Sequence, residues 1–256
     1  VFPWIGCGEC PRCAEGAEND CLKMRTTGVF AAGGYADHIL VPDAKYLLDI
    51  GGLDPHYACT LACAGITSYS ALKKAHPLSA DDKVVIIGAG GVGLTGVGIA
   101  AKYLADHELI VVDLDDEKLA HARQAGASHT INPGTEDALA RIGEITGTGA
   151  GAIVDFVASG ETAAIGFEAT RKGGRYIAVG LYGGQITTPT MMLPGRNLTM
   201  RGSYVGRLDE MIELLELVRE GGITPIPIAK RPMSAVTETL KDIADGAIVG
   251  RVVVTP

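Results

Sequence analysis

Four cysteines near the start of the chain have a spacing that suits a metal ion. They form the pattern C-x2-C-x2-C-x7-C with Cys7, Cys10, Cys13 and Cys21. Four thiolates can hold zinc in a tetrahedron at about 2.3 Å, and a tight loop supplies them without a hydrophobic core. The alternative is a disulfide framework, but such frameworks belong to secreted proteins, and cysteines so close in sequence are poorly placed to pair. We predict a structural zinc site, because four protein ligands leave no position open for substrate.

A second group of residues has the spacing of a phosphate-binding loop. The pattern G-x-G-x-x-G is formed by Gly88, Gly90 and Gly93, with Gly91 and Val92 between the last two. The pattern is weak evidence alone, but here it follows an apolar run at 83–87 and opens a helical pattern at 94–104. An acid, Asp113, follows 20 residues after Gly93, as the dinucleotide-binding motif requires.

Each residue of this loop has a defined physical task in such a site. Gly88 permits the tight turn, Gly90 lets the backbone approach the pyrophosphate, and Gly93 lets the helix pack against the strand. The first turn of the helix offers free N–H groups to the phosphates. Asp113 can accept hydrogen bonds from both hydroxyls of the adenosine ribose. We therefore predict a dinucleotide site.

The elements around this loop alternate along the chain. Strands are expected at residues 83–87, 109–112, 127–131, 152–157, 175–179 and 198–205, and helices at 94–104, 117–124, 136–146 and 161–170. Strands that alternate with helices predict an α/β fold with a doubly wound parallel sheet, the Rossmann arrangement.

The remaining segments do not fit that sheet. A strand is expected at 33–42 and a helix from Pro55 to about residue 72; after the sheet come helices at 208–220 and 234–245 and a strand at 251–254. We therefore expect three parts. Residues 1–64 carry the zinc lobe, residues 65–205 form the NAD-binding domain, and residues 206–256 return to the first domain.

Composition excludes several classes of protein. The 256 residues carry a formal net charge of −8 and show no cluster of Lys and Arg, which argues against a nucleic-acid or anionic-membrane partner. Apolar runs are too short to span a bilayer. No signal peptide is visible, so we expect a cytoplasmic protein.

Several features in one order carry a family resemblance. They are the cysteine lobe, the segment Cys63-Ala64-Gly65-Ile66-Thr67-Ser68-Tyr69, the glycine loop and Gly250-Arg251-Val252-Val253. Together they resemble the zinc-dependent alcohol dehydrogenases of the medium-chain dehydrogenase/reductase family. The resemblance implies a β-rich, GroES-like catalytic domain beside the Rossmann domain, with NAD and zinc as cofactors.

The resemblance also implies roles for individual residues. Cys63, otherwise a small buried hydrophobe, corresponds to a ligand of a catalytic zinc, whereas Cys59 matches no ligand and is expected in the core. Thr67 would lie against the nicotinamide. Lys118 would support the adenosine ribose, although a solvated helix lysine is the alternative. The backbone of Val179, Gly180 and Leu181 would meet the carboxamide of the nicotinamide. Phe156 and Val157 would line the groove that holds the nicotinamide, and Arg251 would lie near the pyrophosphate.

The departures from the family pattern are as informative. The family's first catalytic cysteine, its Gly-His-Glu segment and its proton-relay hydroxyl all precede the cysteine lobe, and this sequence has none of them. We therefore expect a catalytic domain that is incomplete at its N-terminus and a chain that is inactive by itself.

The implied reaction is hydride transfer between an alcohol and NAD, which gives an aldehyde or ketone. Two alternatives remain: a polyol or amino-alcohol dehydrogenase of the same family, or a non-catalytic zinc- and nucleotide-binding fragment. We expect a homodimer or homotetramer that pairs through the apolar run at 198–205, together with residues 223–228.

Overall fold

The structure is a computed structural model, and it describes residues 1–255. The chain divides into two compact units. One contains Val1–Ile66, Val205–Gly222 and the stretch from Pro227 onward; the other contains Thr67–Tyr204 and Ile223–Ile226. No helix among the described residues is long and apolar enough to cross a membrane.

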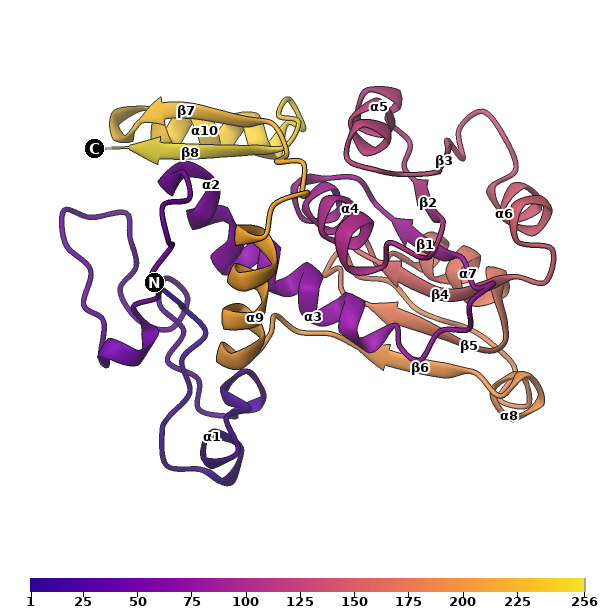
Figure 1. Ribbon diagram of the computed structural model, residues 1–256, viewed down its shortest axis with the longest axis horizontal. Coiled ribbons are helices and arrows are strands. Elements are labelled where there is room, and N and C mark those ends of the chain that lie inside the picture. The colour runs from indigo at the N-terminus through magenta and orange to yellow at the C-terminus, as the bar shows by residue number, and fades with distance from the viewer. Residues whose placement is uncertain (256) are drawn as a thin grey trace. The chain divides into compact units, whose positions relative to one another are not determined.

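The second unit is built on a six-stranded parallel sheet (Figure 1). Its strands are β1 Val84–Ile87, β2 Leu109–Val112, β3 His129–Ile131, β4 Ala150–Asp155, β5 Thr170–Ala178 and β6 Thr199–Gly202. The spatial order is β3-β2-β1-β4-β5-β6, and every neighbouring pair is parallel. All residues of β1, β2 and β4 are buried, which explains their continuous apolar runs. The order of the strands reverses direction between β1 and β4, where such sheets bind ligands.

Helices pack in pairs against this sheet. The unit contains α4 Gly91–Tyr103, α5 Asp116–Gln124, α6 Ala138–Thr146, α7 Gly160–Ala169 and the short α8 Met192–Arg196, together with most of α3 Ile66–Lys74. Helix α4 contacts α5, and α6 contacts α7. Side-chain caps fix where three of them begin, since Asp115, Asp137 and Ser159 each accept a backbone N–H of the first turn.

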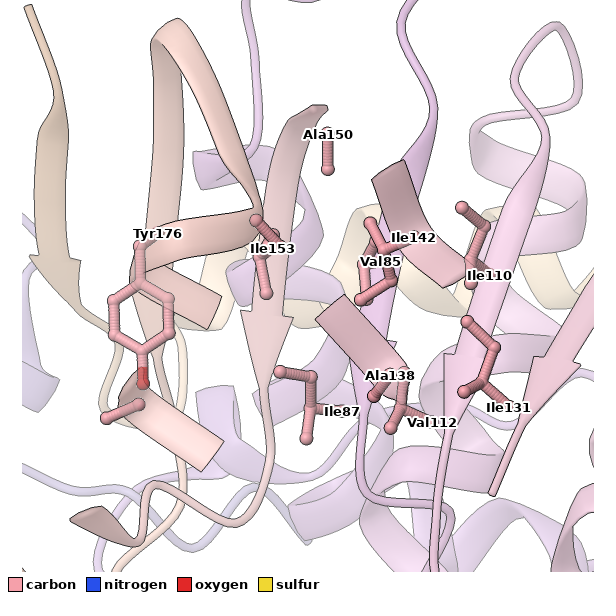
Figure 2. Packing of buried hydrophobic residues seen from close by; sticks show 12 residues of the cluster. Val85, Ile87, Ile110, Val112, Ile131, Ala138, Ile142, Ala150, Ile153 and Tyr176 are labelled. Atoms are coloured by element: carbon pink, nitrogen blue, oxygen red, sulfur yellow. The ribbon is translucent and has the colours of Figure 1, made fainter. Parts of the chain in front are cut away.

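Alternate residues of the central strands build the core between the sheet and the α6–α7 pair (Figure 2). Val85 and Ile87 of β1 pack with Ile110 and Val112 of β2, all at most 3% exposed. Burying one such aliphatic side chain stabilises the fold by about 1.5–3 kcal/mol. Tyr176 of β5 belongs to the same cluster and is the one member that carries a polar group.

The first unit consists largely of short elements. They are α1 Pro11–Ala14, α2 Pro55–Thr60, α9 Leu208–Arg219, β7 Ile228–Pro232, α10 Val236–Ala244 and β8 Arg251–Thr255, with 3-10 turns at Glu18–Asp20, Ala44–Tyr46 and Met233–Ala235. Strands β7 and β8 pair in parallel, and α10 connects them. Helix α2 runs into a π-helical turn at Leu61–Gly65 before α3 begins.

Two expectations for this unit were wrong. Residues 33–42 form no strand, because an alternating segment becomes a strand only where a second strand pairs with it, and none of the described strands does. Strand β7 was not expected, since its sequence IAKRP carries two charges and a proline. Strand β7 forms because β8 pairs with it and supplies hydrogen-bond partners for its backbone, which the sequence of β7 does not predict.

Candidate metal and cofactor sites

The structure brings the four lobe cysteines together. Their Sγ atoms all lie within 4.8 Å of one another, and the separations are 3.5 Å for Cys10–Cys13, 3.8 Å for Cys10–Cys21 and 3.9 Å for Cys7–Cys13. A zinc tetrahedron with Zn–S bonds of about 2.3 Å has S–S edges of about 3.8 Å. A disulfide needs about 2.0 Å, and all four thiols are free. The cluster therefore fits zinc and does not fit disulfides.

Glycines and a short helix hold the cysteines in this arrangement. Cys10 precedes α1, which begins with a proline. Gly8 and Gly16 turn the chain with φ angles of 83° and 74°. A Cβ added to Gly6 would lie 2.5 Å from the Sγ of Cys13, so the close approach of the two requires glycine.

Backbone N–H groups point at the sulfur atoms. Those of Cys7 and Lys23 approach the Sγ of Cys21 at 3.4 and 3.3 Å. The N–H of Glu9 is the main reason that the pKa of Cys7 falls to about 6, whereas burial raises the pKa of Cys13 to about 12. A cation held by these four cysteines would keep all four thiols deprotonated, because coordination removes the proton of a thiol.

Glu18 supports this lobe from inside the unit, and the sequence reasoning missed it. Its carboxylate, 6% exposed, accepts the N–H of Gly6 at 2.8 Å, the hydroxyl of Tyr46 at 2.7 Å and the ammonium of Lys45 at 3.0 Å. Burial raises the pKa of Glu18, but these donors outweigh it, so the pKa lies below its usual value. A single glutamate in a polar stretch gives no signal of such a role in the sequence.

The glycine loop has the geometry that a dinucleotide requires. Gly88 has a φ of 91°, and a Cβ on Gly93 would lie 1.8 Å from the carbonyl oxygen of Gly88. Gly90 differs: its φ of −69° suits any residue, and a Cβ there would meet nothing within 4 Å. The fold itself does not require glycine at position 90, so the open space beside it is available to a bound phosphate.

A cavity of about 730 Å³ runs along the same edge of the sheet. Gly88, Asp113, Lys118 and Val157 line it. Asp113 follows β2, and its carboxylate accepts the N–H of Ala89 at 2.6 Å, so it lies directly beside the glycine loop. Lys118 forms an ion pair with Asp115 at 3.3 Å, which orients its side chain on α5. The sequence reasoning missed Ser159, Thr162 and Tyr182, which also line the cavity.

Five further predicted residues of this unit lie at turns on the same edge, and a sixth, Thr67, lies in a helix. Phe156 and Val157 follow β4, and Val179, Gly180 and Leu181 follow β5. A Cβ on Gly180 would lie 2.1 Å from the carbonyl oxygen of Val157, so the two turns are in contact. Thr67 is half-buried in the first turn of α3, and its neighbour Ser68 donates a hydrogen bond of 3.0 Å to the carbonyl of Val92.

Cys63 and Arg251 belong to the other unit. Cys63 lies in the π-helical turn, a feature that often marks functional sites. Trp4 donates its indole N–H to the carbonyl of Ala62 at 2.8 Å and so anchors this turn. Cys63 is exposed, yet partial removal of the thiol from water raises its pKa. The positive charge of Arg251 lowers the pKa by less, so the pKa of Cys63 lies above its usual value. The Nε of Arg251 is buried and has no hydrogen-bond partner among the described residues.

Cys59 was expected in the core, and that expectation was wrong. Its side chain is exposed and lies at the rim of a cavity of about 210 Å³ that Pro55, Ala58 and Met211 also line. Ala58 and Leu61, three residues apart, form the buried face of this segment, and Cys59 lies outside that face.

Comparisons with known proteins agree with these features. A family model described as zinc-binding dehydrogenase matches residues 91–220. An NAD-dependent alcohol dehydrogenase of Sulfurisphaera tokodaii is 33% identical, with 100% of this chain and 74% of the relative covered. One from Sulfolobus acidocaldarius is 34% identical, with 98% and 72% covered. The crystal structure of the Aeropyrum pernix alcohol dehydrogenase matches with a TM-score of 0.85 at 29% identity, covering 100% of this chain and 75% of that one.

The chain belongs to the zinc-binding dehydrogenase family, within the zinc-type medium-chain alcohol dehydrogenases. The predicted family, the Rossmann-type α/β fold and the enzyme class, an oxidoreductase, are therefore confirmed. The roles of the individual site residues stay predictions, because these similarities do not test them one by one.

Proposed function

We propose that the protein transfers hydride reversibly between an alcohol and NAD, with an aldehyde or ketone as the product. The family supports this reaction, as do relatives named NAD-dependent alcohol dehydrogenase. The observation that carries the proposal is Gly90, whose lack of a side chain serves no contact within the fold and leaves room beside the loop for a pyrophosphate.

Different residues of the proposed site bind different parts of NAD. Asp113 accepts the ribose hydroxyls of the adenosine half, and the first turn of α4 donates N–H groups to the pyrophosphate. The backbone of Val179 to Leu181 orients the carboxamide, with Thr67 at the other side of the ring. When bound, NAD supplies the hydride acceptor, and zinc supplies a Lewis acid for the alcohol oxygen and stability for the cysteine lobe.

Cys63 is proposed as one ligand of the catalytic zinc. Such a site needs three protein ligands and one open position. Among the described residues, the lobe is the one cluster of three or more potential ligands, so Cys63 does not belong to a complete three-ligand site within residues 1–255. Activity is therefore expected in a form of the protein in which two further ligands reach Cys63.

Two classes of alcohol are candidates for the substrate, simple alcohols and polyols. A structure named D-arabinose dehydrogenase from Sulfolobus solfataricus matches with a TM-score of 0.85 at 26% identity, covering 91% of this chain and 73% of that one. That similarity favours sugars and other polyols as the second candidate class. A panel of simple alcohols and polyols, with NADH formation followed at 340 nm, separates the two.

We also propose a homodimer or homotetramer in the cytoplasm. The edge strand β6 pairs on one side only among the described strands, which leaves backbone groups for a second copy. None of the six cysteines is in a disulfide, which supports a reducing compartment.

The test of NAD binding is a valine at position 90. Gly90→Val keeps a φ that any residue adopts, and its Cβ meets no atom within 4 Å, so we expect the variant to fold with its methyl groups in the space proposed for the phosphates. Calorimetry should show NAD affinity reduced at least about thirtyfold, roughly 2 kcal/mol. Gly143→Val is the control, because Gly143 lies exposed on α6 with equally open surroundings. NAD binding by Gly90→Val at the wild-type affinity would refute the proposed site.

A further inference from the structure

Asp155 is the most deeply buried carboxylate of the described chain. It is the last residue of β4 and is 0% exposed. One carboxylate oxygen accepts the N–H groups of Val157 at 2.9 Å and Ala158 at 2.8 Å, and the other accepts the hydroxyl of Tyr176 at 2.8 Å. A buried carboxylate is tolerated only when its oxygens are satisfied in this way.

The backbone of the same residue holds a second turn. The carbonyl oxygen of Asp155 accepts the N–H of Val179 at 2.9 Å and that of Gly180 at 3.1 Å. The N–H of Tyr182 in turn donates to the carbonyl of Val157 at 3.2 Å. Asp155 therefore organises both the turn after β4 and the turn after β5.

The turn after β4 needs this support. Ala158 has a φ of 55°, in the left-handed region that an alanine adopts only when its surroundings impose it. The hydrogen bond from the N–H of Ala158 to Asp155 is one such constraint. Contact of this turn with Gly180 then passes any displacement on to the turn after β5.

Tyr176 anchors the carboxylate to the core. Its ring, 2% exposed, packs beside Ile153, and its hydroxyl is directed toward the end of β4 (Figure 2). Burial and the charge of Asp155 raise the pKa of Tyr176 well above its usual value, so the hydroxyl stays a donor. The carboxylate is thereby fixed relative to the sheet itself.

The place of these turns relates them to one half of the cofactor. A doubly wound sheet consists of two mononucleotide-binding halves, and a dinucleotide lies across the carboxyl ends of the strands where the order reverses. The adenosine half falls to β1 and β2, with the glycine loop and Asp113. The other half then falls to β4 and β5, whose turns Asp155 holds.

We propose that Asp155 and Tyr176 are a positioning pair that shapes the floor of the nicotinamide half of the dinucleotide site without touching the cofactor. The inference rests on the proposed NAD-dependent function. It adds a pair of residues that acts more strongly on the nicotinamide half of the cofactor than on the adenosine half.

Two variants and two ligands test the proposal by calorimetry. Asp155→Asn keeps the size of the side chain and removes the charge that three donors share; Tyr176→Phe removes only the hydroxyl. We expect Asp155→Asn to raise the Kd for NAD about tenfold and Tyr176→Phe about threefold, while the Kd for AMP, which uses only the adenosine half, changes less than about twofold.

Asp82→Asn is the matched control. Asp82 is also a buried carboxylate, 6% exposed, but it precedes β1 at the opposite edge of the sheet, where Arg171 and the N–H of Ser79 hold it. This variant should lower the melting temperature as the others do and leave both Kd values unchanged. A merely structural role for Asp155 would make Asp155→Asn behave like this control.

The outcomes are distinguishable. If both variants fold and bind NAD with the wild-type affinity, Asp155 and Tyr176 are not a positioning pair. If the affinity for AMP falls as far as the affinity for NAD, the pair does not act on the nicotinamide half in particular. If Asp155→Asn does not fold, Tyr176→Phe decides. A wild-type protein that binds neither ligand overturns the proposed function itself.

Discussion

The backbones of Gly88 and Gly93 are in direct contact, since a Cβ on Gly93 would lie 1.8 Å from the carbonyl oxygen of Gly88. This contact sets the start of α4 against the end of β1, next to the cavity that Gly88 and Asp113 line. The arrangement defines which cofactor the edge of the sheet accepts.

NAD should be preferred over NADP by at least about a hundredfold, roughly 3 kcal/mol. The 2′-phosphate of NADP would meet the carboxylate of Asp113, with Asp115 and Asp116 nearby in sequence, and no arginine occurs between Asp113 and Arg123. Calorimetry with both cofactors measures the ratio. Asp113→Asn should reduce the preference for NAD over NADP. Asp106 is an exposed aspartate that precedes β2, and Asp106→Asn should leave this preference unchanged. Equal affinity of the wild type for both cofactors would contradict the prediction.

Cys10→Ser should release the structural zinc and loosen residues 5–25. The reason is that the remaining three thiolates no longer close the tetrahedron. NAD affinity should persist, because the lobe and the glycine loop belong to different units. Metal analysis and limited proteolysis give the readouts, and Cys59→Ser, which alters an exposed thiol outside the cluster, should change neither. Loss of NAD binding with zinc retained would show that the lobe has been misassigned.

The polypeptide of these 256 residues, tested by itself, should bind about one zinc and oxidise no alcohol. One cluster of four potential ligands is found among the described residues, and Cys63 alone cannot hold a second ion. NAD should still bind, since the loop and Asp113 are in place. Elemental analysis and a dehydrogenase assay on the same sample check this. Sustained alcohol-dependent NADH production would mean that catalysis uses residues not identified above.

The protein should be a dimer or tetramer at micromolar concentration. Strand β6 is one of the two edge strands of the sheet, and three of its four residues are exposed. An edge of this kind favours pairing with a second copy. Size-exclusion chromatography with light scattering measures the mass directly, and the mass of a single chain would count against the prediction.

Asp82→Asn should lower the free energy of unfolding by about 1–3 kcal/mol at pH 7, because the ion pair with Arg171 is lost. The pKa of Asp82 lies below its usual value, chiefly because of its hydrogen bonds with Arg171. A depressed pKa contributes stability above the unfolded value of about 3.9, and that contribution is lost as the pH falls through the folded pKa. Urea unfolding of both proteins should therefore show a constant difference above about pH 5 that shrinks below about pH 4. A difference that grows in acid would reverse the sign and exclude this cause.

Local patterns in the sequence predicted most elements of the second unit and its glycine loop, although the short helix α8 was not expected. Residues 109–112 were expected as a strand and form β2 with those bounds, because four consecutive apolar, mostly β-branched residues suit a strand buried on both faces. The cysteine cluster was also readable, since its ligands lie within 15 consecutive residues and a short loop can bring them together.

Only the tertiary structure decided which distant groups meet. Asp155 and Tyr176 are 21 residues apart and Asp82 and Arg171 are 89 apart, so neither pair has a spacing that a local pattern could reveal. The segment 33–42 and strand β7 both show that local sequence does not by itself predict a strand. An alternating segment without a pairing strand stays irregular, while the charged sequence of β7 becomes a strand because β8 lies beside it. Strand pairing and buried polar contacts depend on partners supplied by the whole fold, and a residue's own neighbours in sequence do not specify those partners.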